Sequence, residues 1–126
     1  MGPLGFVAVG IGAAIGAWLR WGFSVIWNAL NPALPYGTLA ANLLGGYLIG
    51  VAVGFFDTHP GLPPEWRLLA ITGFLGGLTT FSTFSSEALA NLMSGDYGWA
   101  LLHVVTHLGG SLLLAGLGLW TYRFLA

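Results

Sequence analysis

The sequence predicts an all-helical membrane protein with four membrane-spanning helices. Of its 126 residues, 56% are hydrophobic and only 6% are charged. Soluble domains carry about 25% charged residues, so this chain cannot cover a soluble surface. Four apolar segments reach the length of roughly 20 residues that a spanning helix needs. We expect a single four-helix transmembrane domain over residues 1–126, with helices at about 4–30, 36–56, 67–94 and 97–124.

Short connections separate the first three expected helices. The first helix contains one charge, Arg20, and the second contains none. Between them lies Asn31–Pro35, whose asparagine and two prolines are typical of a turn. The stretch from Asp57 to Glu65 has three prolines and a glycine and is a second loop. Short loops of this kind join antiparallel neighbours.

The third and fourth expected helices are also nearly free of charge. The third contains the apolar run Leu68–Ser86, with Arg67 before it and Glu87 after it. A turn at Ser94–Asp96 leads to the fourth helix, which has no charged residue before Arg123. We therefore expect every acid to lie in a loop or at a helix end.

The charges exclude several classes of function. Proton-coupled cation carriers use buried acids, and none is expected here. With three Arg, no Lys and a net charge of −1, the chain lacks the basic patch that nucleic-acid binding needs. No nucleophile–base–acid set is visible, so an enzyme is not expected.

The positive charges give only a weak orientation signal. Cytoplasmic loops of membrane proteins carry an excess of Lys and Arg. Arg67, Arg123 and the N-terminus fall on one side, and Arg20 lies toward the other. A weak bias permits both orientations and hence an inverted pair of identical subunits, although Arg67 and Arg123 could equally fix one orientation.

Two small-residue ridges offer surfaces for close helix packing. Gly12 and Gly16 form one, and Gly46, Gly50 and Gly54 form the other. Such ridges let helix backbones approach closely, either between subunits or within one subunit.

The third helix carries the most informative motif, from Gly73 to Ser86. Glycine costs about 1 kcal/mol in a helix interior, so the Gly76–Gly77 pair predicts a break near the helix centre. A broken helix in a membrane exposes carbonyls that could bind a small cation such as Na⁺. Six hydroxyl residues follow within eight positions and could escort an ion. Alternatively, they bond back to their own helix carbonyls.

Aromatic and polar residues nearby could form an anion path. Phe81 and Phe84 share one helix face, and the positive edges of their rings can meet an anion without holding it tightly. Thr38 and Asn42 lie one helical turn apart, and the amide N–H groups of Asn42 could bind an anion or a neighbouring helix. Arg20 either attracts anions at a pore entrance or extends to the headgroups.

His103, His107 and Ser111 form a polar stripe on the fourth helix, because they are spaced four residues apart. Pore lining and buried hydrogen bonds are the better interpretations. Two histidines at this spacing could also bind a metal, but no third ligand is apparent in the sequence. If the imidazoles line a pore, transport could depend on pH.

Three motifs together resemble the small Fluc/CrcB fluoride channels. They are GAAIGAWLR at 12–20, GTLAANLLG at 37–45 and the stretch 73–84 with its GGLTTFSTF core. The third motif is highly specific, and the resemblance covers nearly the whole chain. It implies an antiparallel, dual-topology homodimer in the cell membrane, with two pores that let fluoride leave the cytoplasm passively.

The resemblance also implies roles for individual residues. A structural Na⁺ at the dimer centre would bind the backbone carbonyls of Gly76 and Thr79. The anion pathway would consist of Arg20, Thr38, Asn42, Thr80, Phe81, Ser82, Thr83, Phe84, His103, His107 and Ser111. At His103 and His107 the family commonly has Tyr and Ser, so the polar track is chemically altered here, whereas Ser111 is kept.

Two other functions remain open at this point. A small multidrug-type carrier, also an inverted four-helix dimer, would need an acid in its first helix, where only Arg20 is charged. A structural membrane subunit without transport activity would explain the glycines but not the hydroxyl-rich motif beside Phe81 and Phe84.

Overall fold

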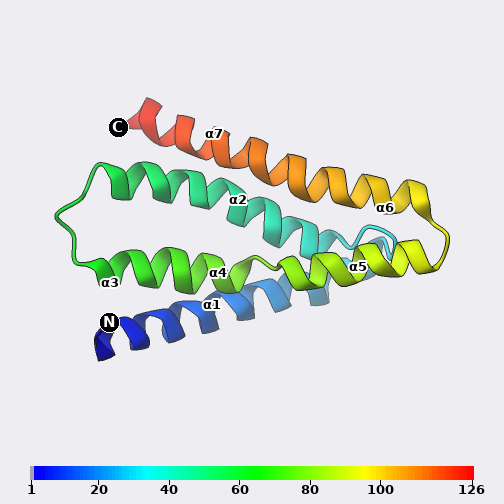
Figure 1. Cartoon of the computed structure of the whole chain (residues 1–126), viewed down its shortest axis with the longest axis horizontal. Helices are drawn as coiled ribbons and strands as arrows, with labels where there is room; N and C mark the ends of the chain where they lie inside the picture. The colour runs from blue at the N-terminus through cyan, green and yellow to red at the C-terminus, as the bar shows by residue number, and fades with distance from the viewer. Residues whose placement is uncertain (1) are drawn as a thin grey trace.

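A computed structural model describes residues 2–126, and within them the chain forms helices joined by short connections. Four helical segments are long and apolar enough to cross a membrane (Figure 1). The prediction of an all-helical membrane protein with four spans is therefore confirmed. The spans are Pro3–Leu30, Tyr36–Asp57, Pro64–Met93 and Tyr97–Leu125.

The first two spans are built simply, and the last two are composite. The first consists of α1 (Pro3–Trp27) and the short η1 (Asn28–Leu30), and the second is α2 (Tyr36–Asp57). Two of the segments that follow, η2 and η3, are π-helical, a geometry often found at functional sites. The last two spans comprise α3 (Pro64–Arg67), η2 (Leu68–Leu75), α4 (Gly76–Leu78), α5 (Phe81–Met93), α6 (Tyr97–Val104), η3 (Val105–Gly109) and α7 (Gly110–Leu125).

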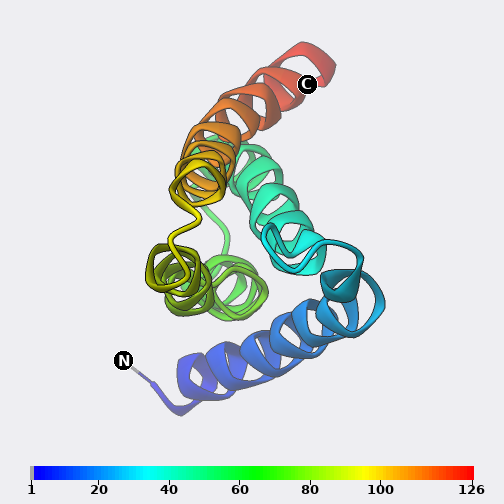
Figure 2. The ribbon, with the colours of Figure 1, turned by 90° about the vertical axis from the view of Figure 1, so that its right-hand side faces the viewer.

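The third span passes between two neighbours. Its first half, η2 and α4, packs against α1, and its second half, α5, packs against α6. A second extensive contact joins α2 to α7 (Figure 2). Both termini and the α2–α3 loop lie at one end of the molecule, as Figure 1 shows. Arg67 and Arg123 therefore share an end, as expected.

Both glycine ridges pack inside the subunit. A Cβ built on Gly12 would collide with the Leu69 carbonyl oxygen, so this ridge allows α1 to lie directly on η2. A Cβ on Gly50 would likewise collide with the Ala115 carbonyl oxygen of α7. Of the two interpretations of these ridges, the structure shows packing within one subunit.

The third span is broken at Thr79 and Thr80, as predicted. Both residues have extended backbone, with φ −91° and ψ 152° at Thr79 and φ −145° and ψ 120° at Thr80. Thr80 is also the N-cap of α5, because its Oγ1 accepts a hydrogen bond from the Thr83 amide at 3.1 Å. The break lies just after the glycine pair and close to α2.

Candidate functional site

Asn42 of α2 holds the broken segment in place. Its Nδ2 donates to the Thr80 carbonyl at 3.1 Å, and the Thr80 amide donates to Asn42 Oδ1 at 2.8 Å. These two bonds fix which end of the amide is nitrogen. The same Nδ2 lies 2.9 Å from His107 Nδ1. Because an amide nitrogen only donates, His107 Nδ1 accepts, and the neutral ring carries its hydrogen on Nε2.

The break removes the regular partners of several backbone carbonyls, including the two predicted to bind a cation. In a helix the carbonyl of residue i accepts from the amide of residue i+4. The Thr80 amide, which would serve Gly76, donates to Asn42 instead. The Thr83 amide, which would serve Thr79, donates to the Thr80 side chain. The Gly76 and Thr79 carbonyls thus lose their regular partners, and free carbonyls at a helix break suit a cation such as Na⁺.

Arg20 contacts the same break from α1. Its Nε donates to the Gly77 carbonyl at 3.0 Å, and its side chain is half-buried. Neither interpretation of Arg20 from the sequence included this contact. Arg20 therefore caps one carbonyl near the break, while those of Gly76 and Thr79 lack their regular donors.

The two phenylalanines occupy different environments at the start of α5. Phe81 is 72% exposed and Phe84 only 6% exposed, with their ring centroids 5.4 Å apart. The Phe84 ring stacks on His103 at 5.1 Å and lies 4.9 Å from the His107 ring. Phe84 thus joins the third span to the histidines of the fourth.

A groove of about 490 Å³ brings many of the predicted residues together. It lies beside the break and is bounded by α2, the third span and the start of α7. The predicted site residues that line it are Asn42, Gly76, Thr79, Thr80, Phe81, Phe84, His107 and Ser111. The remaining predicted residues are outside its lining, namely Arg20, Thr38, Ser82, Thr83 and His103.

Half of the hydroxyls in the third-span motif bond back to their own helix, as the simpler interpretation expected. Thr79, Ser85 and Ser86 each donate to a carbonyl three or four residues earlier. Thr80 and Ser82 instead lie with their hydroxyl oxygens 3.3 Å apart. Local helix bonding therefore does not account for the whole motif.

Glu87 is a functional candidate that the sequence analysis misplaced. We expected it just after the apolar run of the third helix, at a span end, but it lies within α5, half-buried, and its Oε2 accepts from Thr38 Oγ1 at 2.8 Å. The expectation that no acid lies inside a span is wrong for this residue. Glu87 follows Thr80 by seven positions and Phe84 by three, so it lies on the same helix face as both. This spacing could have identified Glu87 as a site residue from the sequence.

Thr38 is fixed by a residue that the sequence analysis did not consider. Its side chain is 1% exposed. Asn28, at the end of the first span, accepts from the Thr38 amide at 3.0 Å and donates to Thr38 Oγ1 at 3.3 Å. Asn28 therefore caps the start of α2 and orients the hydroxyl that bonds Glu87.

The histidine stripe faces inward. His103 is 0% and His107 2% exposed, and their ring centroids are 4.3 Å apart. His103 Nε2 donates to the Phe84 carbonyl at 3.1 Å. Ser111 is half-buried and reaches the Asn42 carbonyl only at 3.5 Å. The stripe therefore combines a buried hydrogen bond at His103 with groove lining at His107 and Ser111.

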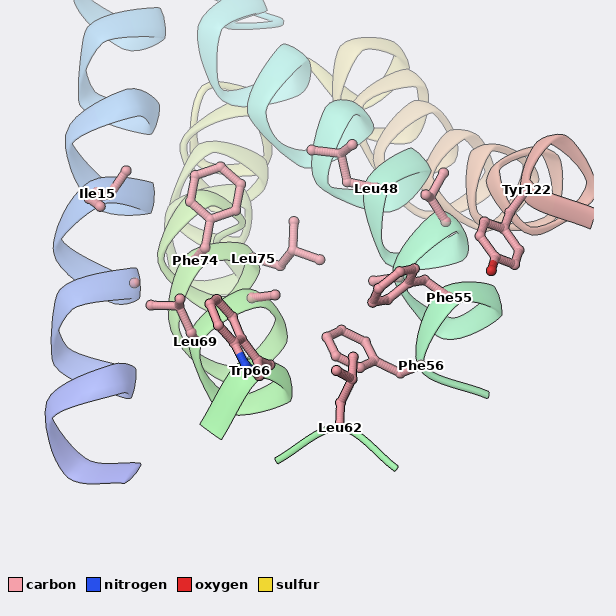
Figure 3. A pocket seen from close by; sticks show the side chains of 14 residues that line it. Ile15, Leu48, Phe55, Phe56, Leu62, Trp66, Leu69, Phe74, Leu75 and Tyr122 are labelled. Atoms are coloured by element: carbon pink, nitrogen blue, oxygen red, sulfur yellow. The ribbon is translucent and has the colours of Figure 1, made fainter. Parts of the chain in front are cut away.

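A second groove differs in chemistry. It has a volume of about 780 Å³ and lies between α1, α2, the start of the third span and Tyr122 (Figure 3). Ile15, Leu48, Phe74 and Leu75 are typical of its side chains. It offers an ion almost no polar partner, so it is not a candidate ion site.

Fold and site together define a multi-pass membrane protein whose polar groups converge on a broken helix. The model of the family described as CrcB-like protein, Camphor Resistance (CrcB), matches residues 7–119. The chain therefore belongs to the CrcB family, which confirms the resemblance drawn from its three motifs.

Full-length relatives are closely similar. The chain is 91% identical over 126 residues to the fluoride-specific ion channel FluC of Cupriavidus pinatubonensis and 85% identical to that of Cupriavidus taiwanensis, with all of each chain covered. It is 59% identical over 117 residues to the fluoride-specific ion channel FluC of Burkholderia pseudomallei, which covers 93% of this chain and 91% of that protein.

Proposed function

We propose that this chain is a fluoride-selective channel, not an enzyme, that gives fluoride a passive exit from the cytoplasm and so protects against fluoride toxicity. Relatives of the same length are named fluoride-specific ion channels. The structural observation that carries the proposal is the polar groove at the break, where Asn42, Thr80, Phe84 and His107 meet.

The groove suits a small, strongly hydrated anion. Fast conduction needs several weak partners that replace water rather than one tight site. Here the Thr80 and Ser111 hydroxyls and the His107 Nε2–H are available donors, and phenylalanine ring edges add weak attraction. The nearby guanidinium, Arg20, is bonded through Nε to the Gly77 carbonyl.

The two alternatives explain less. A drug carrier needs an acid in its first span, and α1 contains only Arg20 as a charged residue. Glu87, the acid found inside α5, is bonded to Thr38 and faces His103. A purely structural subunit gives no reason for the polar groups of the groove.

Fluoride efflux from proteoliposomes tests the function directly. Valinomycin carries the compensating K⁺, and chloride-loaded vesicles are the control. We expect rapid fluoride release without chloride release. A well-folded protein that releases no fluoride would overturn the channel proposal and favour the structural subunit.

Replacing the phenylalanines should slow conduction. Phe81→Ile and Phe84→Ile remove the ring edges but keep apolar bulk, and we expect each to reduce fluoride flux at least about tenfold, equivalent to about 1.4 kcal/mol. Phe124→Ile is the matched control, because Phe124 is also 72% exposed but lies near the end of α7. Flux measured per folded protein that stays unchanged in both test variants would remove the ring-edge argument.

The functional unit in this proposal is an antiparallel homodimer inserted in both orientations. One chain leaves the polar groove open and Phe81 72% exposed. Polar groups facing lipid are costly, and a second copy would cover them. The weak charge bias permits both orientations.

A single labelled position tests this arrangement. The sequence has no cysteine, and Gly61 is exposed in the α2–α3 loop with no atom within 4 Å of an added Cβ. In intact cells we expect about half of a Gly61→Cys protein to react with an impermeant thiol reagent, as a twofold antiparallel pair requires. Complete or absent labelling would contradict dual topology.

The freed carbonyls of Gly76 and Thr79 are the proposed ligands of a structural Na⁺ at the dimer axis. Their regular donors are engaged by Asn42 and Thr80, so the oxygens fit a hard cation. Two carbonyls from each subunit would supply four oxygens. The thermal midpoint should fall when Na⁺ is replaced by a large organic cation, and an unchanged midpoint would argue against the site.

A further inference from the structure

The fourth span supplies two ligands of a possible metal site, and the third span supplies one more. Glu87 lies on α5, His103 on α6 and His107 on η3. One ligand atom from each of the three lies within 4.8 Å of the other two. The sequence offered only the two histidines, because Glu87 comes from a different helix.

All three residues carry a buried polar atom without a hydrogen-bond partner. The atoms are Glu87 Oε1, His103 Nδ1 and His107 Nε2. Buried polar atoms are almost always paired, and leaving one unpaired costs about 1–3 kcal/mol. Each of the three residues that face one another thus has an unused polar atom, and a ligand held between them would supply partners.

From these observations we infer that Glu87, His103 and His107 form a binding site for a divalent transition metal such as Zn²⁺. Two imidazoles and one carboxylate are a donor set that Zn²⁺, Ni²⁺ and Cu²⁺ accept, whereas Mg²⁺ and Ca²⁺ prefer oxygen alone. Bonds of about 2.1 Å in a tetrahedral site place ligand atoms about 3.4 Å apart. Modest side-chain rotation therefore closes the site.

Neighbouring groups already orient two of the ligands. His103 Nε2–H donates to the Phe84 carbonyl, which leaves the lone pair of Nδ1 free. The Thr38 hydroxyl donates a hydrogen bond to Glu87 Oε2, which leaves Oε1 free to bind a metal. Metal-binding histidines and carboxylates typically have such supporting hydrogen bonds.

The third ligand links metal binding to the broken helix. His107 Nδ1 accepts from Asn42, so its lone pair is occupied. A metal either takes Nδ1 in place of Asn42 or binds Nε2 after the ring hydrogen moves to Nδ1, where the Asn42 amide nitrogen cannot accept it. Both routes break the Asn42–His107 bond, and Asn42 also clamps Thr80.

A consequence for transport rests on the proposed function. His107 lines the polar groove, so a dication held there places a fixed positive charge beside the anion path. With the single negative charge of Glu87, the site keeps a net positive charge that retains an anion. We expect Zn²⁺ to slow fluoride efflux.

Metal binding measured in the absence of fluoride tests the metal site independently of the channel function. We would titrate the purified full-length protein with Co²⁺ and follow its visible absorption, then compete with Zn²⁺. His103→Tyr, His107→Ser and Glu87→Gln should each weaken Co²⁺ binding at least about tenfold. His59→Ala is the matched control, since His59 is the chain's third histidine and is exposed in the α2–α3 loop.

Three outcomes decide the inference. The inference is supported if the natural protein and His59→Ala bind Co²⁺ and the three site variants lose this binding while remaining monodisperse. Equal binding by natural and site-variant proteins, or none by the natural protein, overturns it. Zn²⁺ inhibition, expressed against each variant's own efflux rate, should disappear with His103→Tyr; persistent inhibition would place the inhibitory metal elsewhere.

Discussion

Replacing Asn42 by leucine should both destabilise the protein and stop most fluoride flux. The change leaves the Thr80 N–H and C=O without their partners and frees His107 Nδ1. Each unpaired buried group costs about 1–3 kcal/mol, so the two Thr80 groups alone should lower the unfolding free energy by about 2–6 kcal/mol. Flux per folded protein should fall at least about tenfold, because the broken segment loses its position.

Asn91→Leu is the control that separates stability from conduction. Asn91 is also buried and its amide donates to a backbone carbonyl, that of Ala33, at 2.8 Å, but it does not line the groove. We expect this variant to lower the thermal midpoint while flux per folded protein remains. Normal flux and an unchanged midpoint in Asn42→Leu would show that the clamp is not needed.

Adding one methyl group at Gly50 should be as damaging. A Cβ there collides with the Ala115 carbonyl oxygen and would lie 2.8 Å from the Leu119 amide nitrogen, so α2 and α7 must separate. Because both obstacles are backbone, no side chain can move aside. Overpacking typically costs about 1–3 kcal/mol and occasionally more, and a clash with two backbone groups belongs at the upper end. We expect Gly50→Ala to yield little monodisperse protein in size-exclusion chromatography and a markedly lower thermal midpoint.

Gly116→Ala provides the comparison on the facing helix. Gly116 is exposed on α7, and no atom lies within 4 Å of an added Cβ. The same substitution there should leave the elution profile unchanged, and the better helix propensity of alanine favours α7 slightly. Equal behaviour of the two variants would mean that α2 and α7 do not pack through this ridge.

The bilayer makes the helices predictable. A spanning segment must be apolar and satisfy its own backbone, so length and composition alone located all four. The break could also be predicted from neighbouring residues, because the glycine pair and the hydroxyl residues lie next to it in the sequence. Helical spacing singled out Asn42, Phe81, Phe84, His107 and Ser111 as candidates, and the family resemblance joined them into one anion pathway.

Contacts between distant residues could not be predicted in this way. Arg20 and Gly77 are 57 positions apart, and Thr38 and Glu87 are 49 apart. Both contacts depend on how the third span passes between α1 and α6, which no periodicity specifies. Glu87 was misplaced for a related reason. Counting apolar residues ends a span at the first charged residue, even when, as here, another helix supplies a hydrogen-bond partner for that charge.

The break at Thr79 and Thr80 also has an electrostatic consequence. Aligned peptide dipoles give a helix about half a positive charge at its N-terminus and half a negative charge at its C-terminus. The helix that ends at Leu78 therefore has its negative end at the break, where the Gly76 and Thr79 carbonyls lie, while α5 has its positive end at the groove near Phe81. One interruption of the backbone thus presents opposite polarities on its two sides.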